Sequence, residues 1–247
     1  MLSEYEQNSL RQYSKLQREA RYNVGKTGEL LTYKLLKGFE KDGGRILTNV
    51  YVPRENAEST EIDLLLIHKS GIFVFESKNY SGWIFGNENS KYWTQSLTQG
   101  VNTPAIKNQF LNPVYQNELH IKYLGKMLND YAIGEYSKRM QEELMKENTN
   151  FFERKLEKKV PIHSLVVFSE RCVFKDVKAY IRKTRVLKRE ELLLIMKIII
   201  KNNENILNEK DIEWIYKVLL PYSNVSEHFK QMHIENVNKR IENNNRK

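Results

Sequence analysis

The feature that most constrains this chain is a predicted β-hairpin in its first third. Residues 61–67 and 72–78 are rich in β-branched, leucine and aromatic residues, and we expect residues 68–71 to form a four-residue loop between them. The first strand is apolar from residue 62 to residue 67 at every position but one, which predicts a central strand covered on both faces. Pairing Ile67 with Ile72 sets the register of the two strands.

This register places two acidic side chains opposite each other. Asp63, the polar exception in the first strand, lies opposite Glu76, and Lys78 returns to the same face as the diagonal neighbour of Asp63. Cross-strand Cβ atoms are about 5 Å apart, close enough for both carboxylates to hold one hard cation. Without a cation the two acids would repel, and burial would add a desolvation cost. The pair therefore predicts a metal site; the alternative is that Lys78 neutralises one acid while the other faces water.

Composition limits the class of protein without deciding it. The chain has 247 residues, enough for one domain with appendages or two small domains. Forty Lys and Arg against 31 Asp and Glu give a net charge of +9, which favours polyanionic partners such as nucleic acid. The single cysteine, Cys172, forms no internal disulfide, and neither a signal peptide nor an apolar run of about 18 residues is present. We expect a cytoplasmic protein with no membrane partner.

The remaining chain reads as alternating helices and strands. Helices are predicted over residues 3–22, 27–39, 113–130, 189–200 and 209–220, and strands over residues 45–52, 82–85, 92–96 and 163–169. Asn112 and Pro113 suit the N-cap and first turn of the third helix. This order predicts an α/β fold with a mixed central β-sheet flanked by helices.

We divide the chain into four parts. Residues 1–24 are a helical N-terminal arm, residues 25–175 the core, residues 176–234 a helical C-terminal region and residues 235–247 a polar, disordered tail. Within the core, residues 132–160 are a charged insertion that would form a solvated helix, an arm or a mobile lid.

Several segments, taken in order, resemble one known family. The matching pieces are residues 25–29, 60–63, 71–82, 112–116 and 166–169, together with Trp93. An aspartate followed by a strand carrying Glu-x-Lys resembles the PD-(D/E)xK nuclease core, and the ordered set is similar to the nuclease-related domain family, called NERD. Ser77 stands where the family often has an apolar β-branched residue, but only its backbone carbonyl would act as a ligand.

The resemblance implies a nuclease that uses Mg²⁺ or Mn²⁺. Asp63, Glu76 and the carbonyl of Ser77 are the expected metal ligands, and Lys78 would orient or deprotonate the attacking water and stabilise developing charge. The resemblance adds two catalytic candidates: Glu29, an acid that reaches the metal through water, and Gln116, a polar group beside Lys78. Glu29 could instead only favour its helix terminus, and Gln116 could be a solvated helix residue.

A basic segment and three other polar residues complete the candidates. The segment is a predicted phosphate-contact surface, or alternatively a solvated face, and contains Lys175, Lys178, Arg182, Lys183, Arg185, Lys188 and Arg189. His120, one turn after Gln116, is expected to be a packed or surface residue. Glu61 is expected on the strand face opposite Asp63, and His233 is expected to bind no metal because its spacing to other ligands is poor.

Two classes of function remain open. The leading hypothesis is a metal-dependent nuclease acting on nucleic acid, with DNA the substrate that the family resemblance favours. The alternative is a catalytically silent nucleic-acid-binding or adaptor module that retains the nuclease fold. A toxin or defence effector is compatible with the first hypothesis.

Overall fold

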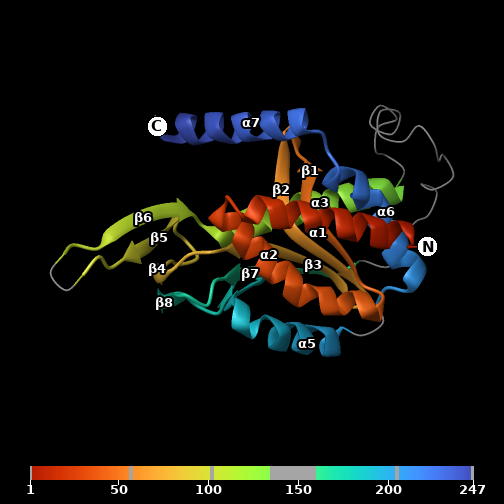
Figure 1. Ribbon diagram of the computed structural model, residues 1–247, viewed down its shortest axis with the longest axis horizontal. Helices are drawn as coiled ribbons and strands as arrows, with labels where there is room; N and C mark the ends of the chain where they lie inside the picture. The colour runs from red at the N-terminus through yellow and green to blue at the C-terminus, as the bar shows by residue number, and fades with distance from the viewer. Residues whose placement is uncertain (1, 56–57, 101–102, 134–159, 204–205, 246–247) are drawn as a thin grey trace.

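The computed structural model describes residues 2–55, 58–100, 103–133, 160–203 and 206–245 (Figure 1). Nearly all of the charged insertion predicted over residues 132–160 lies outside the described residues. The helices are α1 (Glu4–Ala20), α2 (Val24–Leu36), α3 (Pro113–Ile133), α5 (Leu192–Asn202), α6 (Glu209–Ser223), α7 (Glu227–Asn245) and the short 3-10 helices η1 (Lys37–Asp42) and η4 (Arg189–Glu191). The strands are β1 (Arg45–Pro53), β2 (Ser59–His68), β3 (Gly71–Lys78), β4 (Gly82–Phe85), β5 (Tyr92–Leu97), β6 (Ile106–Leu111), β7 (Ile162–Phe168), β8 (Cys172–Asp176), β9 (Tyr180–Ile181) and β10 (Thr184–Lys188).

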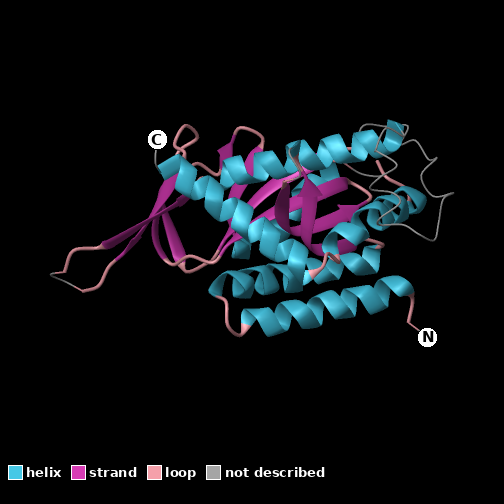
Figure 2. Ribbon diagram, turned by 90° about the horizontal axis from the view of Figure 1, so that it is seen from above, coloured by secondary structure: helices cyan, strands magenta, loops and turns pink. Residues whose placement is uncertain are grey.

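The larger sheet is mixed and lies between two layers of helices, as the α/β prediction requires. Its strand order is β1-β2-β3-β7-β10-β9, with β3 parallel to β7 and β7 parallel to β10. Apolar side chains of α1, α2 and α5 cover one face, and those of α3 and α6 cover the other. Figure 2 shows the strands enclosed between helices on both sides. No helix in the described part of the chain is long and apolar enough to cross a membrane.

A smaller sheet with the order β6-β5-β4-β8 projects from one end of the molecule (Figure 1). Its inner face packs on the larger sheet through the fully buried Ile84 and Trp93, and the Trp93 ring stacks on Phe168 with centroids 6.1 Å apart. Strand β4 begins four residues after β3 ends. The smaller sheet is therefore attached directly to the end of the predicted hairpin.

The predicted hairpin register is confirmed. Ile67 pairs with Ile72, and the ladder continues to Leu64 and Phe75, one step before Asp63 and Glu76. The expected four-residue loop was wrong, because His68 pairs with Gly71 and only two residues turn the chain. Gly71 has φ +121°, and a Cβ there would meet the carbonyl oxygen of Pro161 at 2.5 Å, so the tight turn needs glycine.

A bend in β1 and β2 breaks the regular alternation of their side chains next to Asp63. Asn49 has φ +52°, in the left-handed region, although it lies within β1. Leu47 and Val50, which are three residues apart, consequently join the same hydrophobic core. Asp63 falls at the corresponding position of β2, and the adjacent residues Thr60 and Glu61 both line one cavity with it.

Four other predictions are corrected. Strands β6 and β8 were not expected, and β9 and β10 lie in residues 176–234, where we expected helices only. Strand β10 has two adjacent apolar residues, Val186 and Leu187, among polar ones, so it shows no strand alternation. Helix α2 begins at Val24 instead of residue 27, because the side chain of Asn23 caps it. The tail expected to be disordered from residue 235 is helical to Asn245, since α7 packs on β1 through ring contacts of Phe229 and His233 with Tyr51.

Candidate active site

A cavity of about 470 Å³ opens where the outer ends of β2 and β3 meet α2, α3 and α7. It is lined by the predicted acids Glu29, Asp63 and Glu76, and by Lys78 and Gln116. All five candidates for catalysis therefore share one cavity, although they come from four elements of the fold. Ser77, the predicted carbonyl ligand, lies in its wall as well.

The two facing acids are held by different partners. A side-chain oxygen of Asp63 accepts a hydrogen bond from the backbone N–H of Ser77 at 2.9 Å. Glu76 is almost fully buried, and its Oε1 lies 2.6 Å from Nζ of Lys78. Its Oε2 lies 3.1 Å from Nε2 of His120. The lysine thus pairs with the acid on its own strand.

These contacts separate the pKa values of the two carboxyls. Burial and the nearby Glu76 raise the pKa of Asp63 to about 7. Burial alone would also raise the pKa of Glu76, but Lys78 and His120 outweigh it and hold that pKa at about 2. For Lys78, burial is outweighed by Glu76 and Asp63, and the net effect raises its pKa. Negative charge is therefore concentrated on Glu76.

Helix α2 brings Glu29 to the cavity because Gly28 lets the helix approach the end of β3. A Cβ on Gly28 would lie 2.7 Å from Cβ of Asn79 and 3.3 Å from Oγ of Ser77. Burial and Asp63 raise the pKa of the Glu29 carboxyl to about 8, although Lys26 opposes the shift from a Nζ–Oε2 distance of 2.9 Å. Glu29 is thus a third acid of the cavity and is itself buried, so it is more than a favourable charge at a helix end.

Helix α3 supplies two polar side chains one turn apart. The side chain of Asn112 accepts a hydrogen bond from the N–H of Val114, as its predicted N-cap role requires. Gln116 lines the cavity, and its Oε1 is buried without a hydrogen-bond partner in the described part of the chain. His120 is nearly fully buried and bridges Glu76 to Thr60, whose Oγ1 lies 2.7 Å from Nδ1 of the ring. The expectation that His120 only packs or faces solvent was wrong; its one-turn spacing from Gln116 was the available signal.

The expectation for Glu61 also changes, and His233 is a further residue of the cavity. Glu61 was placed on the strand face opposite Asp63, but it lines the same cavity and lies 3.5 Å from Nζ of Lys26. Residues two apart on a strand share a face, and the bend beside Asp63 turns this part of β2 into the cavity. His233 of α7 lines the cavity too, with Nδ1 2.8 Å from Oγ of Ser59.

The donor set suits a hard divalent cation bound by few protein ligands. The described residues contain no group of three or more His, Cys, Asp and Glu side chains arranged as a metal site. Mg²⁺ does not require one, because it commonly takes one or two carboxylates and keeps several waters. Asp63 and Glu76 are the two carboxylates placed to do so. The unpartnered Oε1 of Gln116 is a buried acceptor that a cation-bound water would satisfy.

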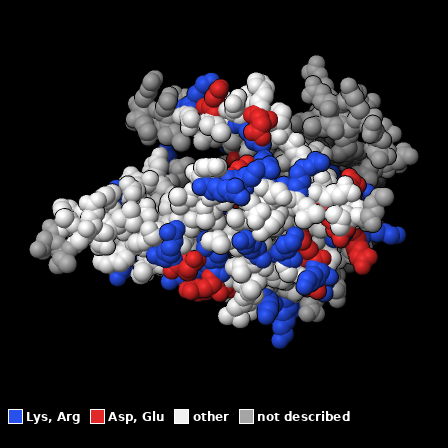
Figure 3. Space-filling view, viewed as in Figure 1, with Lys and Arg blue, Asp and Glu red and all other residues white. Residues whose placement is uncertain are grey.

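The predicted basic segment is dispersed over β8, β10, η4 and the connections on either side of β9. Several of its side chains have acidic partners: Lys178 with Glu88 at 3.9 Å, Arg182 with Glu118 at 2.9 Å and Lys188 with Glu190 at 4.0 Å. Figure 3 likewise shows basic side chains mixed with acidic ones on the visible face.

Arg189 does not fit the expectation for this segment. It is buried and its Nη1 lies 2.7 Å from an oxygen of Glu170, so it has no surface to offer a phosphate. Of the other basic residues, Lys175 and Lys183 are exposed and Arg185 is half-buried.

Comparison with known proteins identifies a family for this chain. The family model of the nuclease-related domain, NERD, matches residues 24–169, more than half of the chain. An uncharacterized protein of Bacillus anthracis is 26% identical over 211 residues, which cover 85% of this chain and 82% of that protein. No solved structure matches.

The chain therefore belongs to the nuclease-related domain family. The family match runs from the start of α2 to the residue after β7, and it includes every catalytic candidate.

Proposed function

We propose that this protein is a metal-dependent nuclease that hydrolyses phosphodiester bonds in DNA. The observation that carries the proposal is the meeting of three acids and a lysine in one cavity: Glu29, Asp63, Glu76 and Lys78. Residues that served only to stabilise the fold would not be gathered in this way, because burying several acids close together costs free energy. The net charge of +9 suits a polyanionic substrate.

The proposed cofactor is Mg²⁺ or Mn²⁺. Asp63, Glu76 and the carbonyl of Ser77 would hold it. Glu29 would reach the ion through a water molecule. When bound, the ion would supply an activated water and charge relief on the phosphoryl oxygens.

The side chains around the ligands have separate roles. Lys78 places a positive charge beside both carboxylates, where negative charge develops on the phosphoryl group. His120 orients the Glu76 carboxylate through Oε2, and Thr60 in turn orients the His120 ring. Gln116 offers a buried amide oxygen that can accept a hydrogen bond from the attacking water.

Cleavage of circular and linear DNA, with Mg²⁺ or Mn²⁺ titrated in, tests the proposal. We expect metal-dependent cleavage by the wild type and a loss of at least about 100-fold in Lys78→Ala, the size of effect seen when one charge-stabilising group is removed. The control is Lys197→Ala, which removes an exposed lysine of α5 and should cleave like the wild type. A fully active Lys78→Ala would remove the lysine from the mechanism.

Calorimetric titration with Mn²⁺ tests the ligands separately. Glu76→Ala should bind the ion more weakly than the wild type, and equal affinity would show that the site is wrongly assigned. If the wild type binds DNA but never cleaves it with either metal, the alternative of a silent nucleic-acid-binding module replaces the nuclease.

A further inference from the structure

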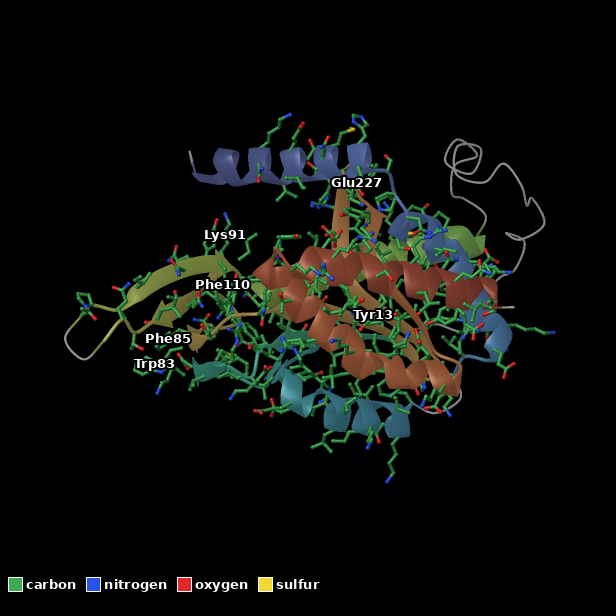
Figure 4. The ribbon with its side chains drawn as sticks, viewed as in Figure 1. Tyr13, Trp83, Phe85, Lys91, Phe110 and Glu227 are labelled. Atoms are coloured by element: carbon green, nitrogen blue, oxygen red, sulfur yellow. The ribbon has the colours of Figure 1, made fainter. Side chains whose placement is uncertain are left out.

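The smaller sheet exposes two aromatic rings on its outer face. Trp83 and Phe85 of β4 are 42% and 36% exposed, whereas Ile84 between them is fully buried in the inner face. Figure 4 shows the two rings close together on this sheet. Large aromatic side chains normally bury their surface, so two on one exposed sheet face indicate a binding surface.

A basic residue accompanies these rings. Val173 of β8 pairs with Trp83, and two residues further along β8 the Nζ atom of Lys175 lies 4.4 Å from the centre of the Trp83 ring. A cation beside an exposed ring is the combination that binds a base and its phosphate together.

The outer face leads to the cavity. Phe85 pairs with Thr94 of β5, and two residues before Thr94 on the same face lies Tyr92, which lines the cavity. Tyr92 pairs with Leu111 of β6, another lining residue. The rings and the candidate active site are therefore joined by one continuous sheet surface.

Charge along this surface favours a polyanion. The strands of the smaller sheet contain two lysines, Lys107 and Lys175, and a single acid, Asp176 at the end of β8. Lys91, just before β5, adds a positive charge at the cavity end, where its Nζ lies 5.3 Å from the centre of the Tyr92 ring. Beside Phe85 the register places the polar residues Thr94 and Gln109, which an apolar protein partner would not select.

We propose that the outer face of the smaller sheet binds an unpaired segment of the nucleic-acid strand whose phosphodiester enters the cavity. Bases stack on Trp83 and Phe85, and Lys175 contacts the adjoining phosphate. Exposed aromatic rings on a four-stranded sheet are one established way to hold two or three unpaired bases. The identity of the polymer rests on the proposed function, and the new inference is that the protein recognises its substrate partly as a single strand.

Binding is measured on the full chain in EDTA, so that no cleavage occurs. Labelled 20-nucleotide single strands of DNA and RNA, and a DNA duplex of the same sequence, are titrated by fluorescence anisotropy at low salt. We expect tighter binding of at least one single strand than of the duplex. Trp83→Ala and Phe85→Ala should each weaken it about 5- to 150-fold, the range for one stacked base.

Two control variants distinguish the loss of an aromatic ring from a general loss of structure. Trp83→Phe keeps an aromatic ring and should retain most of the affinity. Leu194→Ala removes another large exposed side chain, 64% exposed on α5, and should bind like the wild type. Thermal melting of every variant confirms that each is folded.

Tryptophan fluorescence gives an independent readout. Trp93 is fully buried and Trp214 is 3% exposed, so a bound base should quench Trp83 above all. Quenching should disappear in Trp83→Phe while anisotropy still reports binding.

The outcomes separate this proposal from the proposed function. Unchanged single-strand affinity in the double variant Trp83→Ala, Phe85→Ala would overturn it, as would failure of both single strands to bind. In either case, metal-dependent cleavage of duplex DNA would still support the proposed nuclease activity. Conversely, single-strand binding that depends on Trp83 and Phe85, without cleavage under any metal, would support this binding surface and refute the proposed nuclease activity.

Discussion

Replacing Gly28 by alanine tests whether the close approach of α2 to β3 builds the site. The added Cβ would lie 2.7 Å from Cβ of Asn79, whereas an ordinary contact needs at least 3.4 Å, so the helix or Asn79 must move by about 0.7 Å or more. Asn79 cannot swing away freely, because its Nδ2 donates to the carbonyl oxygen of Val24 at 2.6 Å and its Oδ1 accepts from Arg171 at 3.1 Å. The backbone must therefore absorb the shift.

The expected cost follows from this displacement. Overpacking of this size destabilises by about 1–3 kcal/mol, which lowers the melting temperature by roughly 2–12 °C in a chain of this length. Glu29, the next residue, moves with the helix, and a displacement near 1 Å can reduce catalysis about 100-fold. We expect Gly28→Ala to show both effects by thermal melting and DNA cleavage.

Gly38→Ala is the matched control for this experiment. Gly38 lies in the 3-10 helix η1, and a Cβ there would meet nothing within 4 Å. This variant should melt within about 1 °C of the wild type or slightly higher, and cleave normally. If Gly28→Ala behaved like Gly38→Ala in both assays, the close approach would not be what positions Glu29.

Three other features of the structure make separate predictions. His120→Ala removes a partner of Glu76 and should weaken Mn²⁺ binding about 10- to 100-fold, as measured by calorimetry. An unchanged dissociation constant would show that the histidine does not position Glu76. Burial raises the pKa of the Cys172 thiol to about 11, and since only the thiolate reacts, about one thiol in a thousand is reactive at pH 8. Mass spectrometry should therefore find slow alkylation of the native protein, rising with pH toward 11 and on unfolding in urea; rapid native alkylation at pH 8 would contradict the burial. Replacing Lys183 and Arg185 by Gln should lower the log-log salt slope of DNA binding by about 0.9 for each duplex phosphate that these side chains neutralise, and an unaltered slope would make them a solvated face.

The local sequence was sufficient to predict the features that neighbouring residues decide, such as strand register and helix capping. The register from Ile67 and Ile72 followed from two apolar strands and a short connection, since a slip by one residue would turn every side chain to the wrong face. The start of α3 followed from Asn112 and Pro113 because capping is decided within one turn. The family's ordered segments added Glu29 and Gln116, which no spacing rule connects to Asp63.

Only the tertiary structure decided which distant side chains complete the site. His120 reaches Glu76 across 44 residues, a contact set by how α3 crosses the sheet. The adjacent residues Thr60 and Glu61 both line the cavity beside the bend at Asn49, whose left-handed backbone no alternation pattern predicts. Lys175 lies beside Trp83 on the smaller sheet because β8, which follows the end of the family match, pairs with β4. Such contacts depend on crossing angles, strand twist and long-range pairing, which arise from packing of the whole core and leave no periodic signal in the residues themselves.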